Sequence, residues 1–258
     1  RRSVSDQVTL SNEQVESFRR EGFVFVPGFF TAGQAAHIGR WIDEVMAWPE
    51  RPGRHMVYYE DSLTAPGERV VQRVEYFTDF HRGFARIFNQ GRMIRAVAEL
   101  FGEDAVLFKE KVNFKRPGAD GFKAHQDVQA GWNAYAGTYI TALVSIDPAT
   151  LENGCLEVAG GWHGKGLVGA EWAPLDGAVL EAMDFKPYPT EPGDALFFDS
   201  FAPHRSGPNL TKSQRRVLYV TYNRAVEGDQ RERYFSDKRK SFPPDVEREP
   251  GEQYVFRV

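Results

Sequence analysis

From about residue 104 onward, glycine and proline divide the chain into short apolar segments, and this pattern restricts the fold more than any other feature. The turns between these segments include Pro117-Gly118, Asn153-Gly154, Gly160-Gly161 and Pro192-Gly193. The strands expected between the turns cover 106–115, 138–146, 156–158, 185–188, 195–198 and 216–222. Many short strands separated by such turns are typical of antiparallel sandwiches and jelly-roll barrels. The sequence therefore predicts a mainly β architecture.

The part of the chain before residue 104 has the hydrophobic spacing of helices. Ser11 and Gln14 form a capping-box pattern, so a helix is expected to begin at Ser11 and to end at Gly22. The further elements expected here are a strand at 23–26, a helix at about 31–48, an extended segment at 70–77 and a helix at about 84–100 that is broken near Gly91.

These elements fit one domain that covers 1–258. Within it we expect helical support over about 11–102, a barrel core over about 104–225 and a helical tail over about 227–242. Hydrophobic residues make up 41% of the chain, so folding needs neither a disulfide nor a structural metal.

Charge and composition indicate which classes of partner and which cellular compartment to expect. The formal net charge is −4, which gives no support for a nucleic-acid partner. No apolar stretch approaches the roughly 18 to 20 residues of a membrane span, and Arg1–Leu10 lacks a signal-peptide pattern. The single cysteine, Cys155, excludes an intramolecular disulfide and fits a reducing cytosol. We therefore expect a cytoplasmic protein that acts on a small molecule, with its oligomeric state left open.

The segment 121–127 carries a candidate metal site. His125 and Asp127 are two residues apart, so on an extended segment their side chains point to the same side. An imidazole and a carboxylate together suit Fe(II), Mn(II) or Zn(II). A surface turn can contain both residue types by chance, so this pair by itself is weak evidence.

A second segment strengthens the metal hypothesis. Pro192-Gly193-Asp194 begins an apolar strand, and His204 follows it. Two ligands from one strand end and a third from a later strand can cover one face of an octahedron. The three positions that remain open would suit oxygen and a bidentate co-substrate. The alternative for His204 is a loop histidine packed under Pro203.

Arg215 is a candidate for holding that co-substrate. It lies eleven residues after His204, where a barrel strand could run back toward the metal. Its guanidinium could hold a carboxylate of 2-oxoglutarate through two charge-assisted hydrogen bonds. Arg216 is the alternative, because only one of two consecutive strand residues faces the barrel interior.

Together with the turn at 152–158 and Pro203-His204-Arg205-Ser206-Gly207, these segments resemble the phytanoyl-CoA dioxygenase family of iron and 2-oxoglutarate oxygenases. The resemblance covers nearly the whole chain. It implies a double-stranded β-helix barrel of the jelly-roll or cupin-like type, with Fe(II), 2-oxoglutarate and O2 as cofactors. The site residues that it implies are His125, Asp127 and His204 for the metal, and Arg215 rather than Arg216 for 2-oxoglutarate.

The presence of Asp127 also bears on the reaction. Related halogenases replace the metal-binding carboxylate by a small residue, which makes room for chloride. The resemblance therefore implies hydroxylation of a C–H bond rather than halogenation.

A narrower likeness concerns the substrate. Segments 55–61, 108–115 and 220–224 resemble the branch that hydroxylates 2-aminoethylphosphonate and related alkylphosphonates. The chain departs from that branch at 128–132 and at 160–163, close to the expected substrate mouth. An amino acid or a natural-product intermediate is therefore an alternative substrate, and a non-catalytic barrel that binds a metal or a ligand is an alternative function.

The expected strand over 106–115 suggests how an anion could be bound. Lys109, Lys111 and Asn113 share one face at the strand period, and an inward face would place two cations and an amide beside the metal. We assign Lys109 and Asn113, with Arg215, to cofactor binding, and Lys111 to the substrate. Further substrate-binding residues, expected to complement an ammonium group, are Tyr58, Glu75 and Asn223. The alternative is a solvated strand face with the lysine heads in water.

Overall fold

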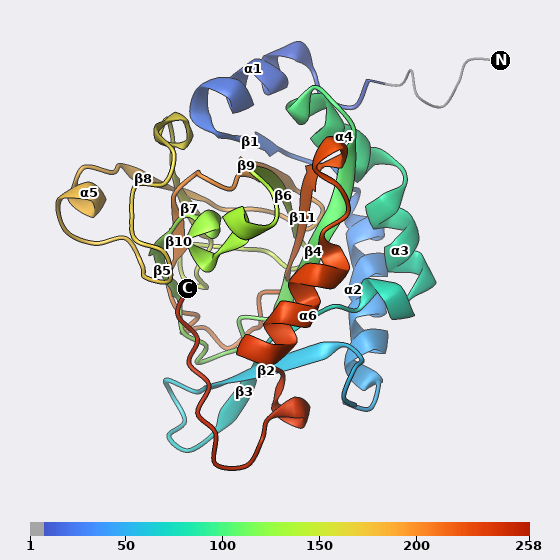
Figure 1. Ribbon diagram of the computed structural model, residues 1–258, viewed down its shortest axis with the longest axis vertical. Helices are drawn as coiled ribbons and strands as arrows, with labels where there is room; N and C mark the ends of the chain where they lie inside the picture. The colour runs from blue at the N-terminus through green and yellow to red at the C-terminus, as the bar shows by residue number, and fades with distance from the viewer. Residues whose placement is uncertain (1–7) are drawn as a thin grey trace.

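The computed structural model describes residues 8–258 and contains two antiparallel sheets that pack face to face (Figure 1). The larger sheet has the order β1 (Phe23–Val26), β9 (Ala195–Asp199), β6 (Tyr139–Ser145), β11 (Val217–Arg224), β4 (Ala105–Asn113), β3 (Arg69–Glu75) and β2 (Met56–Asp61). The smaller sheet has the order β5 (Phe122–His125), β10 (His204–Ser206), β7 (Leu156–Ala159) and β8 (Phe185–Tyr188). Two facing antiparallel sheets of this kind confirm the predicted jelly-roll architecture.

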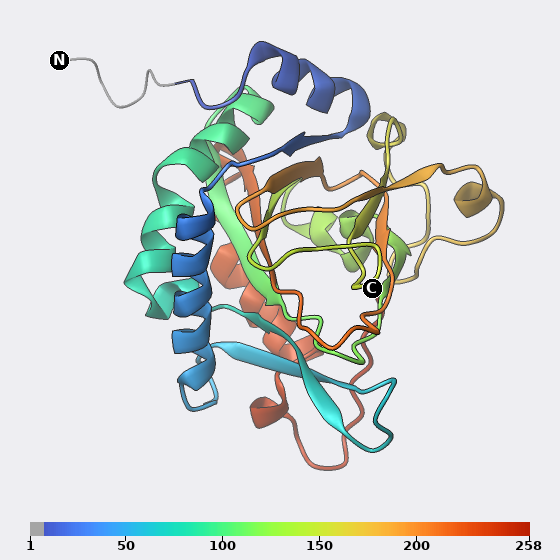
Figure 2. The same ribbon diagram turned by 180° about the vertical axis from the view of Figure 1, so that it is seen from behind.

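Helices cover the outer face of the larger sheet (Figure 2). The helices on this side are α1 (Asn12–Glu21), α2 (Ala32–Ala47), α3 (Arg82–Asn89) and α4 (Arg92–Phe101). Two more helices are α5 (Gly177–Glu181), which precedes β8, and α6 (Arg231–Ser241), which contacts β4. Within residues 8–258, no helix has both the length and the apolar character that crossing a membrane requires.

Side chains of the central strands alternate between the helices and the interior. On β11, Leu218, Val220 and Tyr222 belong to the core beneath the helices, and the hydroxyl of Tyr222 donates to the carbonyl oxygen of Phe88 at 2.6 Å. The intervening residues face the other way, and each lies opposite a residue of β4 in the antiparallel register. These pairs are Tyr219 with Lys111 and Thr221 with Lys109. The alternation therefore turns the polar face of β4 into the barrel, as the strand period predicted.

Local signals in the sequence predicted the helix ends well. Ser11 and Gln14 exchange the two capping-box hydrogen bonds, at 3.1 and 2.9 Å, and Gly22 ends α1 with φ at 84°. The expected break near Gly91 is also confirmed, because α3 and α4 are separate helices and Gly91 has φ at 89°. A residue without Cβ adopts a positive φ at low cost, so glycine suits both the end of α1 at Gly22 and the start of α4 at Gly91.

Several short elements were not predicted. β10 has three residues and α5 has five, whereas β5, which has four, was expected only as part of an extended segment. Periodicity cannot identify elements this short, and β10 and β5 also pair with an irregular register. These two strands nevertheless carry the two histidines of the predicted metal site.

Candidate metal centre and substrate cavity

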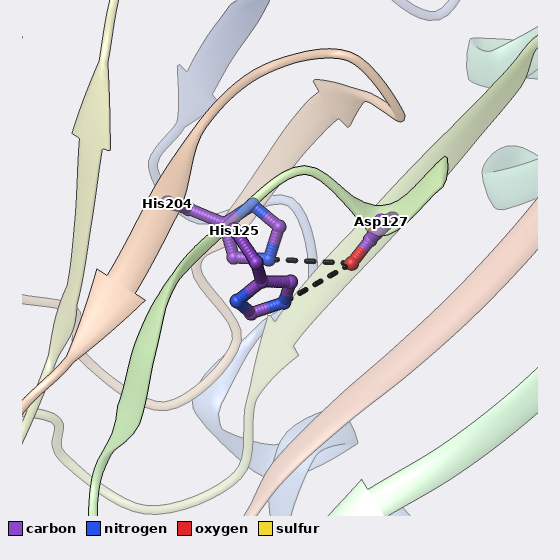
Figure 3. Close-up of side chains that lie close together, drawn as sticks. All are labelled: His125, Asp127 and His204. Atoms are coloured by element: carbon purple, nitrogen blue, oxygen red, sulfur yellow. Dashed lines mark ion pairs between the residues drawn. The ribbon is translucent and has the colours of Figure 1, made fainter. Parts of the chain in front are cut away.

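The three predicted metal ligands converge on one point. His125 ends β5, His204 begins β10, and the two residues are direct partners across the antiparallel ladder. Oδ1 of Asp127 lies 3.5 Å from Nε2 of His125 and 3.4 Å from Nε2 of His204 (Figure 3). The candidate ligand atoms all lie within 4.8 Å of one another. The structure therefore brings together a two-histidine, one-carboxylate set.

Backbone carbonyls orient both imidazoles for coordination. Nδ1 of His125 lies 2.7 Å from the carbonyl oxygen of Lys123, and Nδ1 of His204 lies 3.0 Å from that of Ala202. A carbonyl oxygen can only accept, so each Nδ1 carries the proton and each Nε2 keeps a free lone pair. Both Nε2 atoms face Asp127, as a shared metal ion requires.

The charge states of the triad also suit a divalent metal. Burial by itself would raise the pKa of Asp127, but the imidazoles of His204 and His125 outweigh this effect and hold that pKa well below its usual range. Burial lowers the pKa of His125, and the neighbouring His204 lowers it further. At neutral pH the site thus presents a carboxylate and a neutral imidazole, which are the metal-binding forms. Two imidazoles and one carboxylate with open positions fit non-haem Fe(II).

A tight turn, rather than a continuous strand, brings Asp127 to the histidines. β5 ends at His125, and a 3-10 turn begins at Asp127, so the extended segment predicted through both residues stops at His125. The fully buried Gln126 holds this turn, since its amide donates to the carbonyl oxygens of Gly166 and Phe201, each at 2.8 Å. Gln126 therefore anchors the ligand-bearing turn to two other loops.

The two adjacent arginines point to opposite sides of the sheet. Arg216 faces α2 and is paired with Asp147, with Nε to Oδ2 at 2.9 Å, and with Asp43 at 3.3 Å. Arg215 is only 1% exposed and donates from Nη1 to the carbonyl oxygen of Gly154 at 2.9 Å, while its Nε has no hydrogen-bond partner. Burial lowers the pKa of Arg215, and no acidic residue of the described chain forms an ion pair with it. Arg215 is therefore a buried cation that lacks an anion.

Lys115 is a residue near Arg215 that sequence reasoning missed. Its Nζ donates to Oγ of Ser206 at 2.7 Å, and it is 3% exposed. Burial lowers its pKa to about 7, and the charge of Arg215 contributes. Lys115 lies two residues beyond the end of β4 and has φ at 40°, so the strand period could not place its side chain.

A cavity of about 550 Å³ opens beside the triad. Lys109, Lys111, Asn113 and Glu75 all line it, so the predicted inward face of β4 is confirmed and the solvated-face alternative is wrong. Its walls also include residues that sequence reasoning did not select, among them Arg73, Trp132, Tyr234, Lys238 and the C-terminal stretch 253–258.

Two predicted substrate residues lie elsewhere. The hydroxyl of Tyr58 donates to the carbonyl oxygen of Phe242 at 2.7 Å, and the amide of Asn223 donates to the carbonyl oxygens of Arg224 and Gly228, each at 3.0 Å. Neither side chain lines the cavity. Both therefore tie the chain after β11 to the barrel, and we correct their expected role as partners of a substrate ammonium.

The polar wall of the cavity is predominantly cationic. Among residues 8–258, Glu75 is the buried acid of this wall, and Lys109 donates to Glu75 at 3.1 Å and to the hydroxyl of Tyr234 at 2.9 Å. Lys111 forms no hydrogen bond or ion pair within residues 8–258, and its Nζ lies 5.0 Å from the ring centre of Tyr219. Burial and the charge of Lys109 lower the pKa of Lys111 to about 8. An ammonium group without a protein partner thus faces the cavity.

Comparison with known proteins agrees with this geometry. The model of the phytanoyl-CoA dioxygenase family matches residues 18–217. A methylphosphonate hydroxylase of Gimesia maris is 39% identical over 235 residues, which cover 91% of this chain and 88% of the relative. A 2-aminoethylphosphonate dioxygenase of an uncultured bacterium is 42% identical over 250 residues, which cover 95% of this chain and 94% of the relative.

Solved structures support the fold. The crystal structure of EctD from S. alaskensis with 2-oxoglutarate and 5-hydroxyectoine has a TM-score of 0.73 at 19% identity, and the match covers 86% of this chain and 79% of that one. The match confirms the double-stranded β-helix fold. The two phosphonate-oxidising relatives extend over nearly the whole chain, and their family model covers both β5 and β10. The chain therefore belongs to the phytanoyl-CoA dioxygenase family, and it is a dioxygenase that uses iron and 2-oxoglutarate, as the sequence predicted.

Proposed function

We propose that this dioxygenase hydroxylates a C–H bond of a small alkylphosphonate. The observation that carries the proposal is the excess of buried cations on the cavity wall beside the triad, with Lys111 left without a protein partner. A phosphonate offers three oxygens and up to two negative charges, so it can satisfy several such donors at once. Both relatives near 40% identity are named for phosphonate substrates, which supports the same class here.

His125, Asp127 and His204 would hold the iron, and Arg215 would hold the distal carboxylate of 2-oxoglutarate. The support for Arg215 is its burial without an anionic partner, since a buried cation of this kind is costly until an anion binds. Arg215 and Lys115 lie behind the cavity wall, whereas Ser206, which accepts a hydrogen bond from Lys115, lines the cavity. Lys115 and Ser206 would complete the carboxylate site. Lys109 and Asn113 would also contribute to cofactor binding. Lys109 already donates a hydrogen bond to Glu75, whereas Oδ1 of the buried Asn113 has no hydrogen-bond partner within the described residues.

The remaining donors would orient the substrate. The indole Nε1 of Trp132 and the Nη2 of Arg73 are buried without hydrogen-bond partners, and both residues line the cavity with Lys111. When bound, the iron supplies oxygen activation. The chain's own contribution is to hold the reacting carbon at a fixed place, to exclude water and to leave metal positions open. Because the third ligand is a carboxylate rather than a small residue, the expected outcome is hydroxylation.

This proposal can be tested by measuring how much succinate the enzyme forms from 2-oxoglutarate without a substrate and with each candidate substrate. The iron-loaded protein should give a weak visible charge-transfer band with 2-oxoglutarate in the absence of oxygen. Methylphosphonate and longer alkylphosphonates should then stimulate succinate formation in air, and 31P NMR should detect the hydroxylated product. Asp127→Ala should abolish product formation. Stimulation by amino acids and none by any phosphonate would contradict the proposed substrate class and favour the alternative.

A further inference from the structure

Few acids in the cavity could receive a substrate amino group. The acidic side chains that line it are Asp127, Asp237 and Glu75. Asp127 belongs to the metal triad, and Asp237 is exposed and accepts a hydrogen bond from the hydroxyl of Tyr135 at 2.6 Å. Glu75 is therefore the remaining side-chain carboxylate that could bind an ammonium group inside the cavity.

Glu75 is already surrounded by cations of the chain itself. Its Oε1 lies 3.1 Å from Nζ of Lys109 and 3.6 Å from Nε of Arg73, and its Oε2 lies 2.5 Å from Nζ of Lys238. Burial by itself would raise the pKa of Glu75, but Lys109, Lys238 and Arg73 together hold it well below its usual range. The carboxylate is thus ionised, and Lys109 and Arg73 already balance its charge. Burial and the charges of Lys109 and Arg73 lower the pKa of Lys238 well below its usual range, so its amino group fills the remaining side of Glu75.

The position of Lys238 is set by a packed helix rather than by a loose tail. α6 is attached to the barrel through Arg231, which pairs with the fully buried Glu110, and through Phe235, which is 1% exposed. Lys238 follows Tyr234 by one helical turn, so both side chains point to the same side and both line the cavity. The side chain of Lys238 is 13% exposed, so its ammonium group sits at the inner wall.

We infer that Lys238 occupies the position that the amino group of an aminoalkylphosphonate would take, and that the enzyme thereby selects alkylphosphonates without a cationic amine. This inference rests on the proposed function. A substrate ammonium would have to displace Lys238 from Glu75 or remain without an acceptor among Arg73, Lys109 and Lys238. Either outcome costs a charge-assisted hydrogen bond, which corresponds to a loss of roughly tenfold or more in kcat/KM.

A pair of substrates of equal size tests the inference. n-Propylphosphonate and 2-aminoethylphosphonate differ by a methyl group in place of an ammonium group. Succinate formation should give the wild-type enzyme a preference for n-propylphosphonate of about tenfold or more in kcat/KM. Lys238→Met frees Oε2 of Glu75, so it should reduce that preference about tenfold, mainly because the amine-bearing substrate then binds with a lower KM. Lys238→Arg keeps a nitrogen donor next to Glu75 and should retain the preference.

Lys240→Met is the matched control, because Lys240 is exposed on the same helix and makes no ion pair within the described chain. It should leave the ratio of the two kcat/KM values unchanged. A wild-type preference for 2-aminoethylphosphonate would overturn the inference and leave the proposed function standing. An equal loss for both substrates in Lys238→Met would also overturn it, because Lys238 would then be a ligand of the phosphonate group. If neither phosphonate stimulates succinate formation, the proposed function fails and the inference fails with it.

Discussion

Replacement of Arg215 by methionine offers the sharpest test of how 2-oxoglutarate is held. Arg215 is 1% exposed and has no acidic partner in the described chain, and its side chain donates a hydrogen bond to the carbonyl oxygen of Gly154. Methionine fills a similar volume without the charge. Without 2-oxoglutarate, the variant should therefore melt close to the wild type, because relief from burying an unpaired charge offsets the lost hydrogen bond to Gly154.

The effect on 2-oxoglutarate should be large. A fork of two charge-assisted hydrogen bonds contributes about 1.5 kcal/mol or more per bond, which makes about 3 kcal/mol for the carboxylate. That free energy corresponds to a rise of roughly 100-fold in the KM for 2-oxoglutarate. The KM for the phosphonate should change little, since that substrate binds at the other cations.

Arg216→Met is the natural control and should show the opposite pattern. It breaks the half-buried pair with Asp147, at a cost of about 1 kcal/mol and roughly 2 to 4 °C in Tm. Its KM for 2-oxoglutarate should stay at the wild-type value. Thermal melts of the iron-loaded proteins without oxygen, with and without 2-oxoglutarate, and steady-state kinetics measure both effects. An unchanged KM in Arg215→Met, or a large rise in Arg216→Met, would refute the assignment of the clamp.

Three further predictions concern the triad and the cavity. Asp127→Ala should reduce Fe(II) affinity at least tenfold, which metal titration followed by calorimetry would measure, and wild-type affinity would contradict its role as a ligand. The pKa of Lys111 is lowered to about 8, so the ammonium is lost as pH rises above that value; kcat/KM for the phosphonate should fall about tenfold per pH unit there, and Lys111→Met should remove this dependence. In Gly121→Ala, the new Cβ would collide with the carbonyl oxygen of Ser206, so the substitution should lower Tm and iron content together. A variant with normal iron content would show that β5 and β10 tolerate the added methyl group.

The sequence predicted the metal site better than it predicted the substrate cavity. His125, Asp127 and His204 stand in segments whose turn signals and spacing are visible in one dimension, and the resemblance to a family joined them into one ligand set. The convergence itself depends on β10, a strand of three residues that no periodicity could identify. Capping signals at Ser11 and Gly22 were equally reliable, because they act within one turn of the chain.

The cavity was harder because its walls come from elements far apart in the sequence. Lys109 and Lys111 were predicted to face inward from the strand period alone, and the structure confirms this. Lys238 could not be recognised, since a charged residue in a charge-rich helix is usually solvated and only the docking of α6 brings it to Glu75. The prediction for Asn223 was wrong for a related reason, because its amide donates to the carbonyl oxygen of Arg224, the last residue of β11, and to that of Gly228 in the following turn.

The pairing of His125 with His204 across the ladder has a consequence for the smaller sheet. β5 is the edge strand of that sheet, and its residue pairs with β10 are few and out of register. A metal ion bound by both histidines would cross-link these strands at the place where backbone pairing is weakest. Bound iron would then stabilise the edge of the barrel in addition to supplying the chemistry. Loss of the metal should therefore release β5 before it disturbs the helices behind the larger sheet.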